Sequence, residues 1–127
     1  MKSFRTLLVF VLLAGLFSCQ SHHKVTFTLV QYNVGAFKKY EASGIEGIAR
    51  VARELGADVI TLNEIDSCTT RTGNVDQLAE FAEEMGGWNC HYAAAMPYRG
   101  GAYGVGLASS PSLPILKTGK IALPRVN

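Results

Sequence analysis

The spacing of hydrophobic and polar positions predicts a chain that begins with alternating strands and helices. Val25–Tyr32 alternates at first and is rich in β-branched and aromatic residues, which favours a strand. This strand ends at the turn signal Asn33-Val34-Gly35. Asp58–Ile65 is largely apolar, and this content is typical of a strand buried in the centre of a sheet.

Two further segments carry apolar residues at helical spacing. The first begins with Ser43 and Glu46 in a capping-box pattern and ends at Gly56, in the C-cap position. The second begins similarly, with Asn74 as the N-cap and Gln77 at the third helical position. The expected buried faces are Ile45, Ile48, Val51, Ala52 and Leu55 in the first helix, and Val75, Leu78, Phe81, Ala82 and Met85 in the second.

The remaining segments predict a polar loop and three more strands. The loop is Asp66–Gly73, before the second helix. Trp88–Ala95 and Tyr103–Ala108 are interpreted as strands on either side of the turn Pro97–Gly101, and Leu116–Leu123 as a fifth strand. The order β-α-β-α-β-β-β predicts an α/β domain that starts as a layered unit and continues with antiparallel hairpins.

The first 18 residues have the pattern of an export signal. Lys2 and Arg5 precede Leu7–Phe17, eleven residues without a charged or hydrogen-bonding side chain. A membrane-spanning helix needs about 20 apolar residues, so this run has the length of a signal-peptide core instead. Leu16-Phe17-Ser18-Cys19 resembles a bacterial lipobox, which predicts cleavage before Cys19 and acylation of that residue. The alternative is an ordinary secretory signal with an incidental cysteine.

This interpretation divides the chain into a lipoprotein signal (1–18), a short tether (19–24) and one domain (25–127). It predicts a protein exported to the bacterial cell envelope and anchored to a membrane surface through Cys19. Only a few residues separate this anchor from the first strand, so we expect the domain to stay close to the membrane.

Loss of the signal also changes the charge balance. The whole chain has a net charge of +2, from 12 basic and 10 acidic residues, and Lys2 and Arg5 leave with the signal. The exported part then has no net charge, which disfavours a nonspecific nucleic-acid binder without excluding nucleic acid. Cys68 and Cys90 remain in a compartment that permits disulfides, but their spacing does not decide whether they pair. We favour free or structural thiols.

Two polar residues stand where predicted strands end. Asn33 follows the first strand and Glu64 lies at the end of the second, 31 positions later. A right-handed crossover makes these strands parallel, so both ends lie at the sheet edge where α/β proteins bind ligands. A carboxylate there suits Mg²⁺, a hard cation that prefers oxygen ligands. The simpler interpretation is that Asn33 forms a turn and Glu64 is a polar strand end.

Three segments resemble motifs of the endonuclease/exonuclease/phosphatase family, which has the DNase I-like fold. They are Leu29–Val34 (Leu-Val-Gln-Tyr-Asn-Val), Ala57–Asp66 (Ala-Asp-Val-Ile-Thr-Leu-Asn-Glu-Ile-Asp) and Tyr103–Ser109 (Tyr-Gly-Val-Gly-Leu-Ala-Ser). The order and separations of these motifs match the family across Val25–Ile121. The resemblance implies a two-sheet α/β sandwich and a Mg²⁺-dependent phosphoesterase that cleaves phosphodiesters or phosphomonoesters.

The resemblance also implies roles for individual residues. Glu64 corresponds to the family's metal-binding carboxylate, for Mg²⁺ or Mn²⁺, and Asn33 to the active-site Asn beside that metal. Arg71 lies in a segment similar to one in bacterial members and is placed to meet a phosphate, although a solvated loop arginine is as good an interpretation. Asp76 and Gln77 are interpreted as helix N-terminal residues. Other side chains weighed were His91, interpreted as structural, and Tyr98 and Arg99, weak candidates for substrate contact.

The chain also departs from the family pattern. Asn63 stands where the family has Gln, and Val105 where it has Asn. The downstream Gly-Asp-Phe-Asn and Ser-Asp-His motifs, which supply the catalytic histidine, do not occur. We therefore expect only about the first half of the domain, inactive by itself. The alternatives are an inactive truncated product and a small lipid-anchored binding or structural module.

Overall fold

The computed structural model describes residues 25–38 and 44–121. The predicted signal, the lipidation residue Cys19, the tether 19–24 and the predicted capping residue Ser43 lie outside the described residues. None of the helices within the described ranges is long and apolar enough to cross a membrane.

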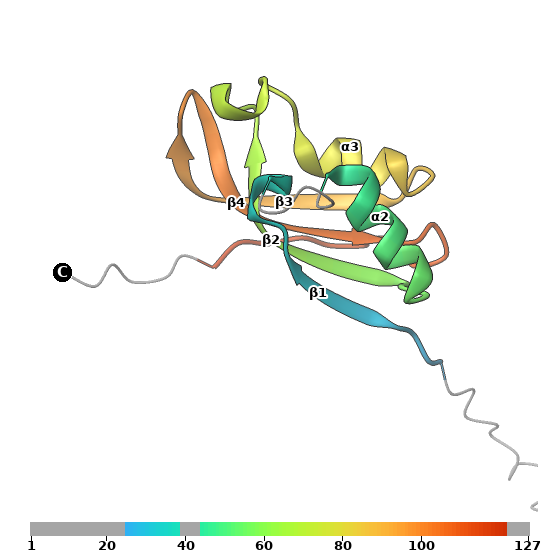
Figure 1. Ribbon diagram of the computed structural model, residues 1–127. Coiled ribbons are helices and arrows are strands. Elements are labelled where there is room, and N and C mark those ends of the chain that lie inside the picture. Colours follow the sequence, from blue (N-terminus) through green and yellow to red (C-terminus); the bar gives the residue numbers. More distant parts are fainter. Residues whose placement is uncertain (1–24, 39–43, 122–127) are drawn as a thin grey trace, which may run out of the picture.

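The protein has an α/β fold built on one mixed sheet of four strands (Figure 1). β1 (Leu29–Asn33) pairs in parallel with β2 (Val59–Ser67). β3 (Asn89–Tyr98) and β4 (Gly101–Ser109) form an antiparallel hairpin, and β4 also pairs antiparallel with β2. The order β1-β2-β4-β3 confirms the predicted parallel pair and the predicted hairpin.

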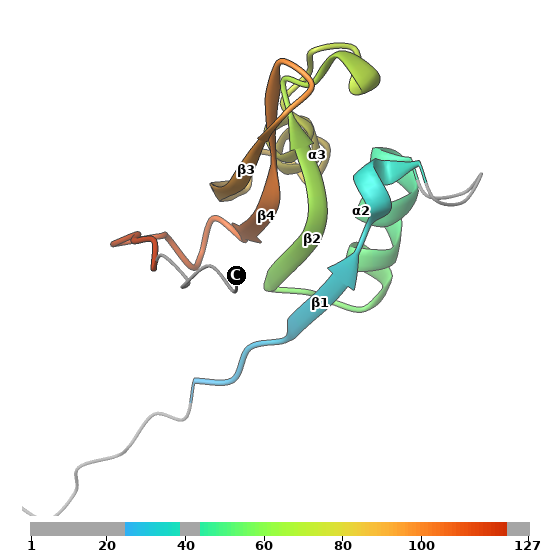
Figure 2. The same ribbon diagram turned by 90° about the vertical axis from the view of Figure 1, so that its left-hand side faces the viewer.

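Two helices, α2 (Ile45–Glu54) and α3 (Gln77–Glu84), cover one face of this sheet (Figures 1 and 2). Both were expected from their apolar spacing. The C-cap of α2 is Leu55, and Gly56 follows it, one position later than predicted, with the left-handed φ of +62° that glycine favours there. Two single-turn 3₁₀ helices follow strand ends: η1 (Gly35–Phe37) after β1 and η2 (Thr70–Thr72) after β2.

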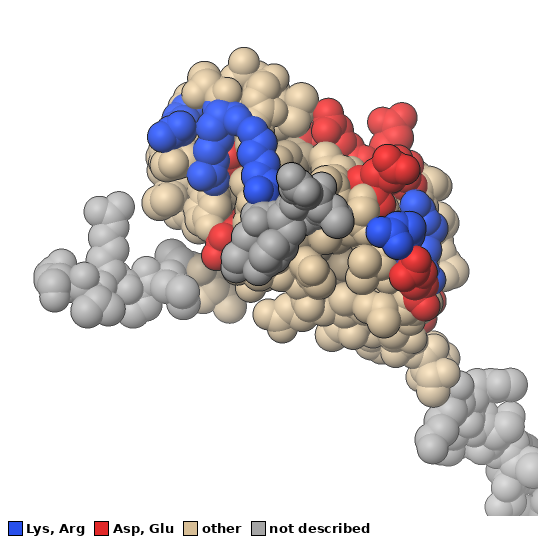
Figure 3. Space-filling view, in the orientation of Figure 1, with Lys and Arg blue, Asp and Glu red and all other residues tan. Residues whose placement is uncertain are grey.

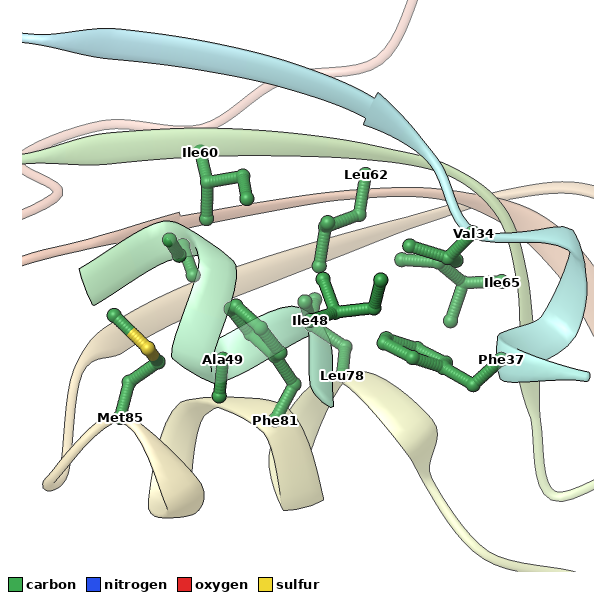
Figure 4. Packing of buried hydrophobic residues seen from close by; sticks show 12 residues of the cluster. Val34, Phe37, Ile48, Ala49, Ile60, Leu62, Ile65, Leu78, Phe81 and Met85 are labelled. Atoms are coloured by element: carbon green, nitrogen blue, oxygen red, sulfur yellow. The ribbon is translucent and has the colours of Figure 1, made fainter. Parts of the chain in front are cut away.

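The core lies between the helices and the covered face of the sheet (Figure 4). Ile60, Leu62 and Ile65 of β2 are at most 1% exposed, and they face Ile48 of α2 and Phe81 of α3. This packing removes apolar side chains from both helices and the central strand from water, which is the main driving force for folding.

Several sequence predictions were wrong in detail. The N-cap of α3 is Asp76, whose carboxylate accepts hydrogen bonds from two backbone N–H groups, whereas Asn74 has a left-handed backbone. Leu55, predicted on the buried face of the first helix, is 56% exposed. β2 continues through Asp66 and Ser67, which were predicted to lie in a loop. Residues 116–121 form no strand, and the last two positions of that predicted strand lie outside the described residues.

Two irregularities of the sheet face each other across Gly104. β2 contains one extra residue between Asn63 and Ile65, and β3 one between Ala94 and Met96, while Gly104 of β4 pairs with both Ile65 and Ala94. A side chain at Gly104 would approach the carbonyl oxygen of Ala93 to 2.2 Å. Such bulges bend strands, and Figure 1 shows β2 and the β3–β4 hairpin turning away from the rest of the sheet at this end.

Candidate functional site

The structure brings Asn33 and Glu64 into direct contact at the end of the parallel pair. The Asn33 side-chain Nδ2 donates a hydrogen bond of 2.8 Å to Oε1 of Glu64. The Asn33 Oδ1 accepts one of 3.1 Å from the backbone N–H of Gly35. The predicted convergence of these two residues is therefore confirmed, and the amide of Asn33 is oriented by its own turn.

Glu64 is the extra residue of the β2 bulge and has a left-handed backbone, with φ +62°. A residue that carries a Cβ atom avoids this region, because the conformation costs roughly 1–3 kcal/mol. Strained residues and bulges concentrate at functional sites, where a bulge redirects one side chain. Here the bulge sets Glu64 outside the regular alternation of β2.

Glu64 lines a surface pocket of about 540 Å³ at this end of the sheet. The pocket collects residues from η1, the β2 bulge, η2 and the β3–β4 hairpin. The other lining residues are Gly35, Ala36, Lys38, Arg71, Met96, Tyr98 and Tyr103. Two of the lining side chains are basic, two are tyrosines and one is the Glu64 carboxylate, so the pocket suits an anionic ligand.

Arg71 contributes to this pocket in a different way from either sequence interpretation. Its Nε and Nη2 donate bonds of 2.6 and 2.7 Å to the two carboxylate oxygens of Asp66. Its guanidinium carbon lies 4.6 Å from the ring centre of Tyr98 and 5.6 Å from that of Tyr103. The solvated-loop interpretation is wrong, because Arg71 is held by an ion pair and two rings. The edge of the guanidinium that was expected to bind a phosphate binds the Asp66 carboxylate instead.

Asp66 is the buried anchor of this arrangement. Its side chain is fully buried and also accepts a 2.6 Å hydrogen bond from the Thr69 hydroxyl. The hydrogen bonds from Arg71 lower the pKa of Asp66 below 3.8, against the opposing effect of burial. The same contact raises the pKa of Arg71. The pair therefore stays ionised and presents the guanidinium to the pocket in a fixed orientation.

The pocket end of the sheet carries both an acidic and several basic side chains close together. Burial and then the charge of Glu64 raise the pKa of Tyr103. Lys38 Nζ donates a 2.6 Å hydrogen bond to the carbonyl of Arg71, and the Arg99 guanidinium lies 5.5 Å from the Tyr98 ring centre. Figure 3 shows Lys and Arg side chains gathered over this end, while most of the acidic side chains in view lie on the side of the helices, together with further basic ones.

The sequence did not single out several residues of this site. Lys38 and Met96 carry no recognisable motif, and Asp66 was assigned to a loop. The bulge itself has a signal that was missed: the buried positions Ile60 and Leu62 are two apart, but the next is Ile65, three further on. This slip in the alternation marks an added residue.

A metal ion at this site would have few protein ligands. The described residues contain no group of three or more His, Cys, Asp or Glu side chains that could surround a metal ion. Glu64 with Asn33 instead provides a single carboxylate and a neighbouring amide beside an open pocket. Mg²⁺ is commonly held by one or two carboxylates together with waters and substrate phosphate, so these residues fit an open Mg²⁺ or Mn²⁺ site.

The other singled-out residues lie away from this centre or beside it. His91 is partly buried on β3 opposite Leu107, as a structural histidine would be. Tyr98 lines the pocket. Cys68 and Cys90 are free thiols, as favoured, and both are exposed.

In comparisons with known proteins, the chain matched no protein-family model, no curated protein and no solved structure.

Proposed function

We propose that Glu64 and Asn33 form the metal-binding part of an exported, lipid-anchored phosphoester hydrolase of the endonuclease/exonuclease/phosphatase type. The observation that carries this proposal is the bulge at Glu64. A left-handed glutamate is costly in a central strand, and here the Glu64 carboxylate lines the pocket and accepts a hydrogen bond from the Asn33 amide. A merely polar strand end needs none of these features.

The pocket residues support a division of roles. Glu64 would hold Mg²⁺ or Mn²⁺, while Asn33 orients the carboxylate through its 2.8 Å hydrogen bond. When bound, the metal supplies charge neutralisation to a phosphate ester. Lys38 and the guanidinium of Arg71, which Asp66 holds in place, add positive charge to the same pocket. The substrate class is a phosphate ester near the membrane, with nucleic acid left open but not favoured.

Phosphoester hydrolysis also needs a group that accepts a proton from the attacking water, most often a histidine. The lining residues in the described part of the chain include no histidine. We therefore propose that this chain by itself binds metal and phosphate but turns over slowly or not at all. A lipid-anchored binding module with the same metal-dependent phosphate site is the second candidate, favoured by this same observation.

Binding of Mn²⁺ to the full chain, followed by electron paramagnetic resonance, tests the proposal. Glu64→Gln keeps the shape of the side chain and removes its charge. Since the affinity of oxygen-ligand sites follows their charge, we expect Mn²⁺ binding to weaken by at least about tenfold. Glu83→Gln, on the exposed surface of α3, is the matched control and should bind normally. Equal Mn²⁺ affinity in Glu64→Gln and the parent chain would refute the metal assignment.

Phosphate recognition is tested in the same system. Inorganic phosphate should change the electron paramagnetic resonance spectrum of Mn²⁺ bound to the parent chain, because the basic side chains lie in the same pocket. Hydrolysis of an activated phosphodiester should stay near background for the chain alone. Rapid Mn²⁺-dependent hydrolysis that survives Glu64→Gln would contradict both the role of Glu64 and the expected lack of a proton-transfer group.

A further inference from the structure

Gln77, the first residue of α3, connects the two backbone segments that carry the Asn33–Glu64 pair. Its side chain is almost completely buried, with 4% exposure. Oε1 of Gln77 accepts a 2.9 Å hydrogen bond from the backbone N–H of Asp66. Nε2 donates one of 2.8 Å to the backbone carbonyl of Ala36. One amide therefore bridges the strand beyond the bulge and the turn beyond β1.

Both bridged segments have unusual backbones. Ala36 and Phe37 have φ values of +54° and +52°, and Glu64, two residues before Asp66, has φ +62°. Non-glycine residues leave such conformations unless the surroundings hold them in place. The parallel ladder ends at the pairing of Asn33 with Asn63, and one further backbone hydrogen bond, from Val34 to Asn63, follows it. Beyond that point, Gln77 supplies buried hydrogen bonds to both segments.

We propose that Gln77 is a positioning residue that holds the strand ends at the separation required for the Asn33–Glu64 hydrogen bond. Its amide is suited to this role because it accepts from one segment and donates to the other. A carboxylate would repel the Ala36 carbonyl, and an apolar side chain would leave both backbone groups without their buried partner. Helix α3 thus sets the geometry of the pocket without contributing a side chain to its lining.

A test of this inference by Mn²⁺ affinity rests on the proposed function, whereas a test by the NMR signal of the Asn33 amide does not. Nuclear magnetic resonance of the full chain reports the Asn33 side-chain amide directly. In Gln77→Met, which has a similar volume, we expect the shifted signal of a hydrogen-bonded Asn33 amide to move toward that of an exposed amide. Mn²⁺ affinity should fall about tenfold or more, as for other residues that orient metal ligands. Gln31→Met, on the exposed part of β1, is the control.

Gln77→Glu provides a second arm that a simple loss of stability would not reproduce. At pH 8 the buried carboxylate cannot donate to Ala36, so the Asn33 signal should shift as in Gln77→Met. Burial raises the pKa of such a carboxyl group, and near pH 5.5 its protonated form can donate and accept like the native amide. The Asn33 signal should then return toward its position in the parent chain. This rescue on acidification is also measurable if Gln77→Met does not fold.

The outcomes separate the two proposals. If the parent chain binds no Mn²⁺ but the Asn33 signal responds to Gln77 variants, the proposed function fails and the positioning role stands. If Gln77→Met folds and leaves both the Asn33 signal and Mn²⁺ affinity unchanged, the positioning role is overturned. In Gln77→Glu, an Asn33 signal that is displaced at pH 8 and stays displaced at pH 5.5 has the same consequence.

Discussion

At the scale of single residues, the most constrained group is the Asp66 carboxylate. It is fully buried and receives hydrogen bonds from Arg71 and Thr69, so its charge is compensated only within this network. Removing one partner of a buried ion pair costs more than the pair contributes, because the other charge is left uncompensated. Asp66 therefore links the stability of the fold to the orientation of Arg71.

The first prediction concerns the stability of the folded protein in acid. Because the pKa of Asp66 is lowered in the folded state, its stabilisation is complete above its unfolded pKa of about 4 and is lost as pH falls through the folded value. The free energy of unfolding, measured by urea titration between pH 6 and pH 3, should decrease with acid. Asp66→Asn should lower it by about 3 kcal/mol at pH 6 and flatten this pH dependence.

Glu83→Gln controls for a change in overall charge. Its free energy of unfolding should depend on pH as steeply as that of the parent chain. The double variant Asp66→Asn with Arg71→Met should recover part of the loss, because it removes the unpaired cation. A pH slope in Asp66→Asn as steep as that of the parent chain would show that other carboxylates carry the effect.

The sequence could predict the pair at the centre of the site but not its surroundings. Asn33 and Glu64 stand at ends of strands whose types and order follow from local patterns, so their convergence was foreseeable. The Arg71–Asp66 contact joins residues only five apart, yet it depends on β2 continuing through Asp66 past a bulge. The bridge through Gln77 depends on the docking of α3, which no local pattern encodes.

At the scale of elements, the sequence predicted which helices and strands form better than it predicted where they begin and end. Apolar spacing located both helices, and the largely apolar content of Asp58–Ile65 located the central strand. The N-cap of α3 was misplaced by two residues, because Asn74 and Asp76 are both good capping residues and the loop geometry decides between them. The predicted last strand lacks a partner in the described sheet, and strand formation depends more on such packing than on the residues themselves.

The second prediction belongs to the scale of elements and concerns Gly104, where β4 passes between two bulges. Gly104→Ala would place Cβ 2.2 Å from a backbone carbonyl, a contact that side-chain rotation cannot relieve. We expect a loss of roughly 3 kcal/mol or more in unfolding free energy, at the upper end of overpacking effects. Gly119→Ala is the control, since a Cβ there meets nothing within 4 Å. A melting temperature for Gly104→Ala equal to that of the control would contradict the close approach of the strands.

At the scale of the whole molecule, the two faces of the sheet differ. The helices cover one face, while side chains such as Leu29 and Val105 are 59% and 47% exposed. Exposed apolar side chains together with unpaired strand edges favour association. The basic end and most of the acidic side chains in view also lie on different parts of the surface (Figure 3).

Location gives the third prediction of this section. If Cys19 is acylated, the full chain expressed in a bacterium should fractionate with membranes and incorporate labelled fatty acid. Cys19→Ala should release it from the membrane or leave its signal uncleaved, and it should carry no label. Cys68→Ala keeps the lipobox and should behave as the parent chain. Equal labelling of Cys19→Ala and the parent would remove the anchor from the proposed function.

The bulge in β2 affects how mutation can create or remove this site. Ile60, Leu62 and Ile65 all face the core, so Glu64 is one residue added to an otherwise regular alternation. Deleting it would join Asn63 to Ile65 and leave every core residue of the strand on its present face. The carboxylate is thus the kind of feature that a single-codon insertion can introduce and a single-codon deletion can erase, while the surrounding scaffold persists.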